Sequence, residues 1–137
     1  MDDINEFCKK NYISEDQLYG REKINGDLDL RKVTGLPDDF NLTVGGDLVL
    51  YNLESLPENF NLTVGGDLYM NSIKSLPEGF NPTVDGDLYL SDIKGLPKGF
   101  NPTVGGDLFL NSVKGLPEGF SVGGDIYLRH SLYKGGK

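Results

Sequence analysis

The apolar residues of this chain recur with a period of 20 residues. In the unit "GDLYLSDIKGLPKGFNPTVG" (residues 86–105), Leu88 and Leu90 alternate around Tyr89. That alternation predicts a short strand with two side chains inward and one outward. The remaining apolar residues lie three or four positions apart, which is typical of a coil that keeps turning one edge toward a shared axis. These residues are Ile93, Leu96, Phe100 and Val104.

Five such units tile residues 26–125, and a sixth strand signal, "GDIYL", follows. The motif Gly-Asp-Leu keeps the 20-residue step throughout, beginning at Gly26, Gly46, Gly66, Gly86 and Gly106. The last unit is two residues shorter, because "GFSVGGD" stands where the preceding unit reads "GFNPTVGGD". Repeats of this length are typical of solenoids, in which each repeat buries its apolar edge only against its neighbours. We therefore predict a solenoid over residues 24–128, with one short parallel strand per coil.

Proline and glycine recur at fixed positions in each unit, where the chain is predicted to turn. Pro97 fixes the backbone after Leu96 and opposes a regular helix there. Gly105 and Gly106 are predicted to allow the tight reversal that returns the chain to the strand.

The two ends of the chain break the repeat, and we expect them to cap the solenoid. Residues 1–23 are predicted to form two short helices over the first coil. Asp3 and Glu6 have the spacing of a capping box, and so do Ser14 and Gln17, with Ile13 and Leu18 as a hydrophobic staple. Residues 129–137 are predicted to be a C-terminal cap or tail, in which Leu132 and Tyr133 fold over the last coil.

The segment "LYLSDIKGLP" (residues 88–97) resembles the strand and turn of leucine-rich repeat proteins, especially the short bacterial kind with Leu-Pro in every repeat. Residues 96–110 are closer still to the repeat "LPxGFNPTVGGDLxL" of many bacterial and phage proteins. The resemblance covers residues 24–128 and implies binding in general, without naming a partner. The family's fixed Asn after the strand is absent, since this first position is occupied in turn by Tyr51, Asn71, Ser91 and Asn111. Both an open horseshoe and a straighter β-helix-like rod therefore remain open.

The charge and the cysteine content exclude several classes of protein. A net charge of −8, from 21 acids and 13 bases, opposes direct binding of nucleic acid but permits binding to a basic surface. No apolar run is long enough to span a membrane, and the N-terminus lacks the apolar core of a secretory signal. The single cysteine, Cys8, fits a reducing compartment and a buried structural role. We expect a cytoplasmic protein, of a bacterium or of an infected host cell.

The inventory of reactive side chains does not predict an enzyme or a cofactor. One His (His130) and one Cys cannot supply a zinc site, and no Ser is singled out as a nucleophile. The repeated aspartates are weak candidates for calcium, because coils about 4.8 Å apart could let neighbouring carboxylates share an ion. We favour the alternative, in which each carboxylate accepts backbone N–H groups at its turn. The calcium candidates are Asp47, Asp67, Asp87 and Asp107.

The outward middle residue of each strand predicts a binding face. Four of these residues in succession are aromatic, and exposed aromatic area mostly marks interaction surfaces. The alternative is a stacked ladder that stiffens the sheet. A column of lysines beside it (Lys74, Lys94 and Lys114) is predicted to face acids in neighbouring turns, such as Asp92 or Glu118. The candidate binding residues are Val49, Tyr69, Tyr89, Phe109 and Tyr127 in the column, with Tyr51, Asn71 and Asn111 beside it.

Three functions are compatible with this face. The first is a non-catalytic module that binds a protein partner through the aromatic column. The second is an acidic decoy, of the kind phages use, that inhibits a host defence or nucleic-acid-binding protein. The third is a structural spacer without a partner.

Overall fold

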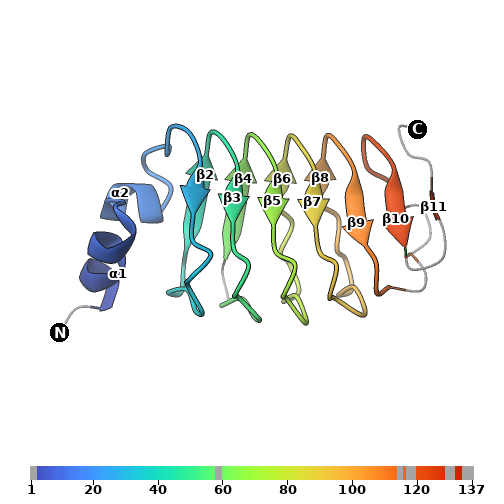
Figure 1. The fold of residues 1–137 in the computed structure, drawn as a ribbon, viewed down its shortest axis with the longest axis horizontal. Helices are drawn as coiled ribbons and strands as arrows, with labels where there is room; N and C mark the ends of the chain where they lie inside the picture. Colours follow the sequence, from blue (N-terminus) through green and yellow to red (C-terminus); the bar gives the residue numbers. More distant parts are fainter. Residues whose placement is uncertain (1–2, 58–59, 114–115, 117–119, 129–131, 134–137) are drawn as a thin grey trace.

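The chain forms a parallel β-solenoid that begins with two short helices, which confirms the predicted fold class (Figure 1). The computed structural model describes residues 3–57, 60–113, 116, 120–128 and 132–133. The predicted strand is present in each coil, and these strands form a seven-stranded sheet in the order β1-β3-β5-β7-β9-β10-β11. Their bounds are Leu28–Asp29 (β1), Leu48–Val49 (β3), Leu68–Tyr69 (β5), Leu88–Tyr89 (β7), Leu108–Leu110 (β9), Ile126–Leu128 (β10) and Leu132–Tyr133 (β11).

The register of this sheet follows the sequence period. Each strand from β1 to β9 pairs in parallel with the residue 20 positions on, as in Leu68 with Leu88. The step from β9 to β10 is 18 residues, with Phe109 opposite Tyr127, so the shortened last repeat leaves the pairing undisturbed. Strand β11 then covers the edge of β10 in the antiparallel sense.

A second sheet, which the sequence analysis did not predict, runs along the other side of the coils. It has the order β2-β4-β6-β8, with bounds Asn41–Val44, Asn61–Val64, Thr83–Val84 and Thr103–Val104. Strands β2 and β4 have four residues, whereas β6 and β8 have two. Pro82 and Pro102 stand immediately before the shorter strands, at the positions where β2 and β4 have leucine, and proline has no N–H to donate to a sheet.

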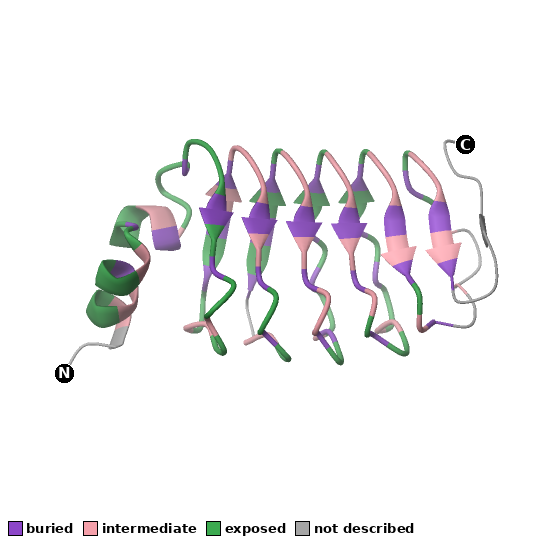
Figure 2. Cartoon of the chain, in the orientation of Figure 1, coloured by how far each residue is buried: buried purple, intermediate pink, exposed green. Residues whose placement is uncertain are grey.

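The core lies between the two sheets as columns of equivalent residues (Figure 2). The inward residues of each strand are buried, among them Leu88 and Leu90, as the alternation predicts. A column of phenylalanines stacks inside the coils, with ring centroids 5.1 Å apart between Phe40 and Phe60 and 5.4 Å between Phe60 and Phe80. Burial of this repeated apolar edge is the main favourable term for a solenoid.

The N-terminal helices cover the first coil. Helix α1 (Asp3–Asn11) places the ring of Phe7 edge-on to Phe40, with centroids 6.2 Å apart. The predicted capping box of Ser14 and Gln17 is present at the start of α2 (Glu15–Leu18). Helix α1 begins at Asp3, so that residue lies in the first turn and is not the predicted N-cap.

Three further expectations concern the ends of the chain. Ile13 and Leu18 are both buried, as a hydrophobic staple requires, and Cys8 is buried as predicted. His130 and most of the predicted C-terminal cap lie outside the described residues.

Aspartate side chains connect each coil to the next. The Asp87 Oδ1 accepts a hydrogen bond of 2.8 Å from the backbone N–H of Asp107, and the same bond joins every successive pair in the column. The series runs from Asp27 through Asp47, Asp67, Asp87 and Asp107 to Asp125. Each carboxylate therefore binds the next coil, whereas the sequence analysis placed its bond within the turn.

This contact explains the glycine that precedes each aspartate from Asp47 to Asp125. A Cβ on Gly86 would overlap the Asp67 Oδ1 and would lie 2.7 Å from the Gly66 carbonyl oxygen. The φ of Gly86 is not in the left-handed region, so the predicted conformational freedom is not the reason for a glycine here. The glycine is required because the two coils approach closely at this point. Gly46, Gly66, Gly106 and Gly124 meet the preceding aspartate in the same way.

We predict that Gly86→Ala lowers the free energy of unfolding by about 1–3 kcal/mol, because the new methyl group displaces the Asp67 carboxylate. Gly95 has open space around its Cβ position and provides the matched control. Gly95→Ala should leave the stability unchanged or raise it by up to about 1 kcal/mol. Urea unfolding followed by circular dichroism measures both, and equal effects of the two substitutions would contradict the close-approach explanation.

Candidate functional site

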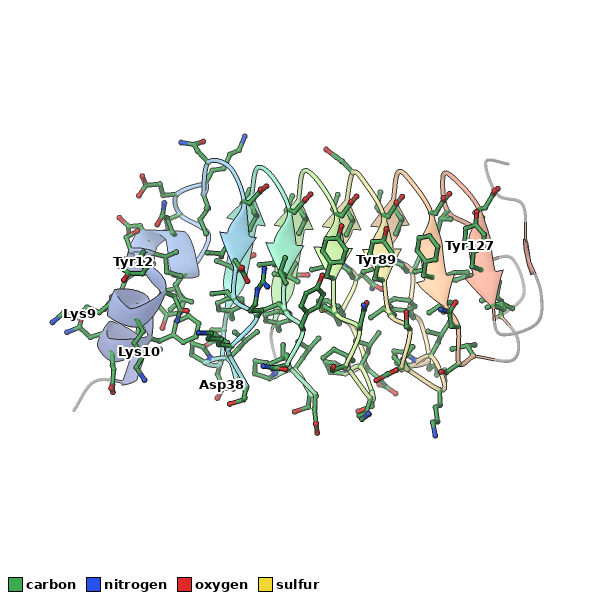
Figure 3. The ribbon with its side chains drawn as sticks, in the orientation of Figure 1. Lys9, Lys10, Tyr12, Asp38, Tyr89 and Tyr127 are labelled. Atoms are coloured by element: carbon green, nitrogen blue, oxygen red, sulfur yellow. The ribbon has the colours of Figure 1, made fainter. Side chains whose placement is uncertain are left out.

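The outward side chains of the seven-stranded sheet form an aromatic ladder. The term denotes Tyr69, Tyr89, Phe109 and Tyr127, whose ring centroids are 4.7, 4.6 and 4.7 Å apart along the series. The rings are parallel within 5° and half-buried. Figure 3 shows Tyr89 and Tyr127 in one row across the strands. The structure thus brings four of the predicted site residues together at the spacing of the strands.

The N-terminal end of the ladder differs from the rest. Val49 occupies the same column, half-buried and without a ring. Tyr51, which is 38% exposed, packs edge-on against Tyr69 with centroids 5.9 Å apart. The aromatic surface therefore continues past Val49 through the neighbouring column.

An ion pair that the sequence analysis missed lies at this end. Arg31 Nη2 is 2.8 Å from Asp29 Oδ2, and the Arg31 guanidinium lies over the Tyr51 ring, 6.0 Å from its centroid. A hydrogen bond from Arg31 lowers the pKa of the Asp29 carboxyl. The signal was in the spacing, since Arg31 follows Asp29 by two residues in the turn after β1, and Asp29 stands in the ladder column.

The two predicted asparagines offer different surfaces. Asn111 is exposed, whereas Asn71 is half-buried and its Oδ1 is buried without a hydrogen-bond partner among the described residues. The Asn71 main-chain oxygen accepts a hydrogen bond of 3.2 Å from the Asp92 N–H. The Asn111 side chain is therefore the more exposed of the two.

The aspartate column runs along the hydroxyl side of the ladder. The Tyr69 hydroxyl donates to Asp67 Oδ2 over 3.3 Å, and the Tyr89 hydroxyl donates to Asp87 Oδ2 over 3.4 Å. Burial and then the nearby Asp67 charge raise the pKa of Tyr69 to about 12. Burial and then the Asp87 charge raise the pKa of Tyr89 in the same direction. The ladder thus lies in a negative electrostatic environment.

The calcium candidates have a structural role in this arrangement. The Oδ1 atoms of Asp47, Asp67, Asp87 and Asp107 each accept a backbone N–H from the next coil. Within the described ranges, no group of three or more His, Cys, Asp or Glu side chains is placed to hold a metal ion.

The lysine column lies beside this face and is partly paired. Lys74 Nζ is 3.6 Å from Asp92 Oδ2, which is the predicted contact between neighbouring coils. Lys94 is exposed. The equivalent Lys114 and the predicted acid Glu118 lie outside the described residues.

Comparisons of the chain with protein-family models, with curated proteins and with solved structures gave no match. Among the residues that the structure describes, no helix is long and apolar enough to cross a membrane.

We predict that stability falls as the pH rises from about 10 to about 12. The unfolded tyrosines ionise near pH 10, whereas folded Tyr69 holds its proton to about pH 12, so the unfolded state loses protons first. Thermal unfolding across this range measures the loss. The double variant Tyr69→Phe/Tyr89→Phe should show a smaller loss, and Phe109 demonstrates that the stack accepts phenylalanine. An unchanged slope in that variant would contradict the assignment.

Proposed function

We propose that the chain is a non-catalytic protein-interaction module, whose protein partner docks on the aromatic ladder. The observation that carries the proposal is the in-register row of four half-buried rings on the outer face of the seven-stranded sheet. The resemblance to leucine-rich-repeat-like proteins of bacteria and phages supports binding as the general role, in the cytoplasm of a bacterium or of an infected host cell.

The stacking supports this function energetically. Binding normally costs about 0.5–1.5 kcal/mol for each flexible side chain that it immobilises. The ladder rings are already held by their neighbours at 4.6–4.7 Å, so a partner meets a surface that is ordered before it arrives. Large aromatic side chains also dominate the energetics of protein interfaces.

The decoy and spacer alternatives differ from this proposal in what they require. A decoy needs the acidic charge of the chain as a whole and does not need the rings. A spacer needs the rings only as cross-strand contacts, each of which contributes about 0.2–1 kcal/mol to the sheet. Removing the rings without removing charge therefore separates the three functions.

The decisive variant is Tyr69→Ala/Tyr89→Ala/Phe109→Ala, used for affinity capture from a bacterial lysate. Thr63→Ala/Thr83→Ala/Thr103→Ala is the matched control, because these threonines are exposed on the second sheet. We expect a protein captured by the wild type and by the threonine variant, and lost with the aromatic variant, at both low and high salt. Should the alanine variant fail to fold, valine at the same three positions replaces it, since Val49 shows that the column accepts valine.

Each alternative gives a different result in the same assay. Binding that survives in the aromatic variant and disappears at high salt indicates a decoy, because charge contacts between exposed groups are screened by salt. Equal capture by the wild type and the aromatic variant at every salt concentration would show that the ladder is not the binding site. A spacer captures no protein that depends on the ladder.

A further inference from the structure

The segments that carry the ladder contribute charges of a single sign. Five segments of the chain build this face, at residues 45–52, 65–72, 85–92, 105–112 and 123–128. They contain seven acids and no Lys or Arg, although the chain has 13 bases. Of these acids, Asp92 pairs with Lys74. Arg129 directly follows the last of the five segments and lies outside the described residues.

The aspartate column keeps part of each carboxylate available to a partner. Each Oδ1 is occupied by the backbone N–H of the next coil, which fixes the side chain. The Oδ2 atoms of Asp67 and Asp87 lie beside the ladder hydroxyls, at 3.3 and 3.4 Å. The charges therefore repeat with the coils, about 4.8 Å apart, along one side of the rings.

The chain itself shows how a cation lies on this surface. At the N-terminal end, the Arg31 guanidinium pairs with Asp29 and covers the Tyr51 ring, which in turn contacts Tyr69. A planar guanidinium can bind a carboxylate with two N–H groups and stack on an aromatic ring at the same time. Between Val49 and the end of β10, the five segments that build the face contain carboxylates and rings but no Lys or Arg, and Lys74 reaches them from the neighbouring column through its pair with Asp92.

We propose that the partner segment which docks on the ladder is basic, and that its arginines pair with the Asp67, Asp87 and Asp107 carboxylates while lying against the ladder rings. This inference rests on the proposed function and names the chemistry of the partner. Arginine is preferred to lysine because its guanidinium is less strongly hydrated and stacks on aromatic rings.

Three labelled peptides test this chemistry with the intact chain. In the first, arginine alternates with glycine; in the second, lysine replaces arginine; in the third, citrulline keeps the shape of arginine without its charge. Fluorescence anisotropy should show the tightest binding for the arginine peptide, weaker binding for the lysine peptide and none for the citrulline peptide. Equal binding of the arginine and lysine peptides would overturn the role of the rings.

Two variants with the same change in net charge locate the site. Asp67→Asn/Asp87→Asn/Asp107→Asn removes three charges and keeps an Oδ1 acceptor for each inter-coil bond. Glu22→Gln/Asp38→Asn/Glu78→Gln removes three exposed charges elsewhere, and Figure 3 shows Asp38 away from the row of Tyr89 and Tyr127. We expect the first variant to weaken binding of the arginine peptide about tenfold and the second to weaken it less than about twofold. Equal losses would show that only net charge matters and would overturn the inference.

The failure of this inference can be told apart from failure of the proposed function. If a captured protein depends on the ladder rings but is unaffected by the three Asp→Asn substitutions and by competing arginine peptide, the interaction module stands and the basic partner is wrong. If the aromatic triple variant binds the arginine peptide as tightly as the wild type, the proposed contact with the rings is wrong. Support requires that both triple variants, aromatic and aspartate, lose the peptide.

Discussion

The hydrogen bond from each aspartate carboxylate to the backbone of the next coil is the interaction on which the rest of the structure depends. It places a side-chain oxygen directly over the glycine of the next coil, as Asp67 Oδ1 lies over Gly86, so residues 19 positions apart in the sequence constrain each other. The bond has the same length in every coil, 2.8 Å. A uniform stacking distance follows, and with it the register of every column inside and outside the coils.

Both aromatic columns are products of that register. Inside the coils, Phe40, Phe60 and Phe80 stack at 5.1 and 5.4 Å, and outside, the ladder stacks at 4.6–4.7 Å. Each column begins with a ring turned edge-on, Phe7 for the inner column and Tyr51 for the outer one. An edge-on ring packs its edge against the face of the first stacked ring, so it covers the end of the stack without extending it. The two columns therefore start in the same way, although one is closed by a helix and the other by a turn.

The sequence predicted those features that depend on the period alone. The alternation around Tyr89 indicated the strand, its buried neighbours and the outward ring, and Ser14 with Gln17 indicated the start of α2. It did not indicate the second sheet, because the alternating residues of Asn41–Val44 are interrupted by proline in later coils. The carboxylate bond and the Arg31–Tyr51 contact were also missed. Both join residues 20 apart, so they become visible only when the coils are stacked.

The shortened last repeat shows which side of the solenoid tolerates change. Its two missing residues belong to the stretch between Phe120 and Gly123, where the fourth strand of the second sheet has no successor, yet Phe109 and Tyr127 remain stacked at 4.7 Å. The perimeter of a coil can thus be altered on the side of the second sheet while the ladder side keeps its geometry. Loops of new sequence can therefore be inserted on the side of the second sheet. A protein with this fold can vary that side without altering the ladder surface.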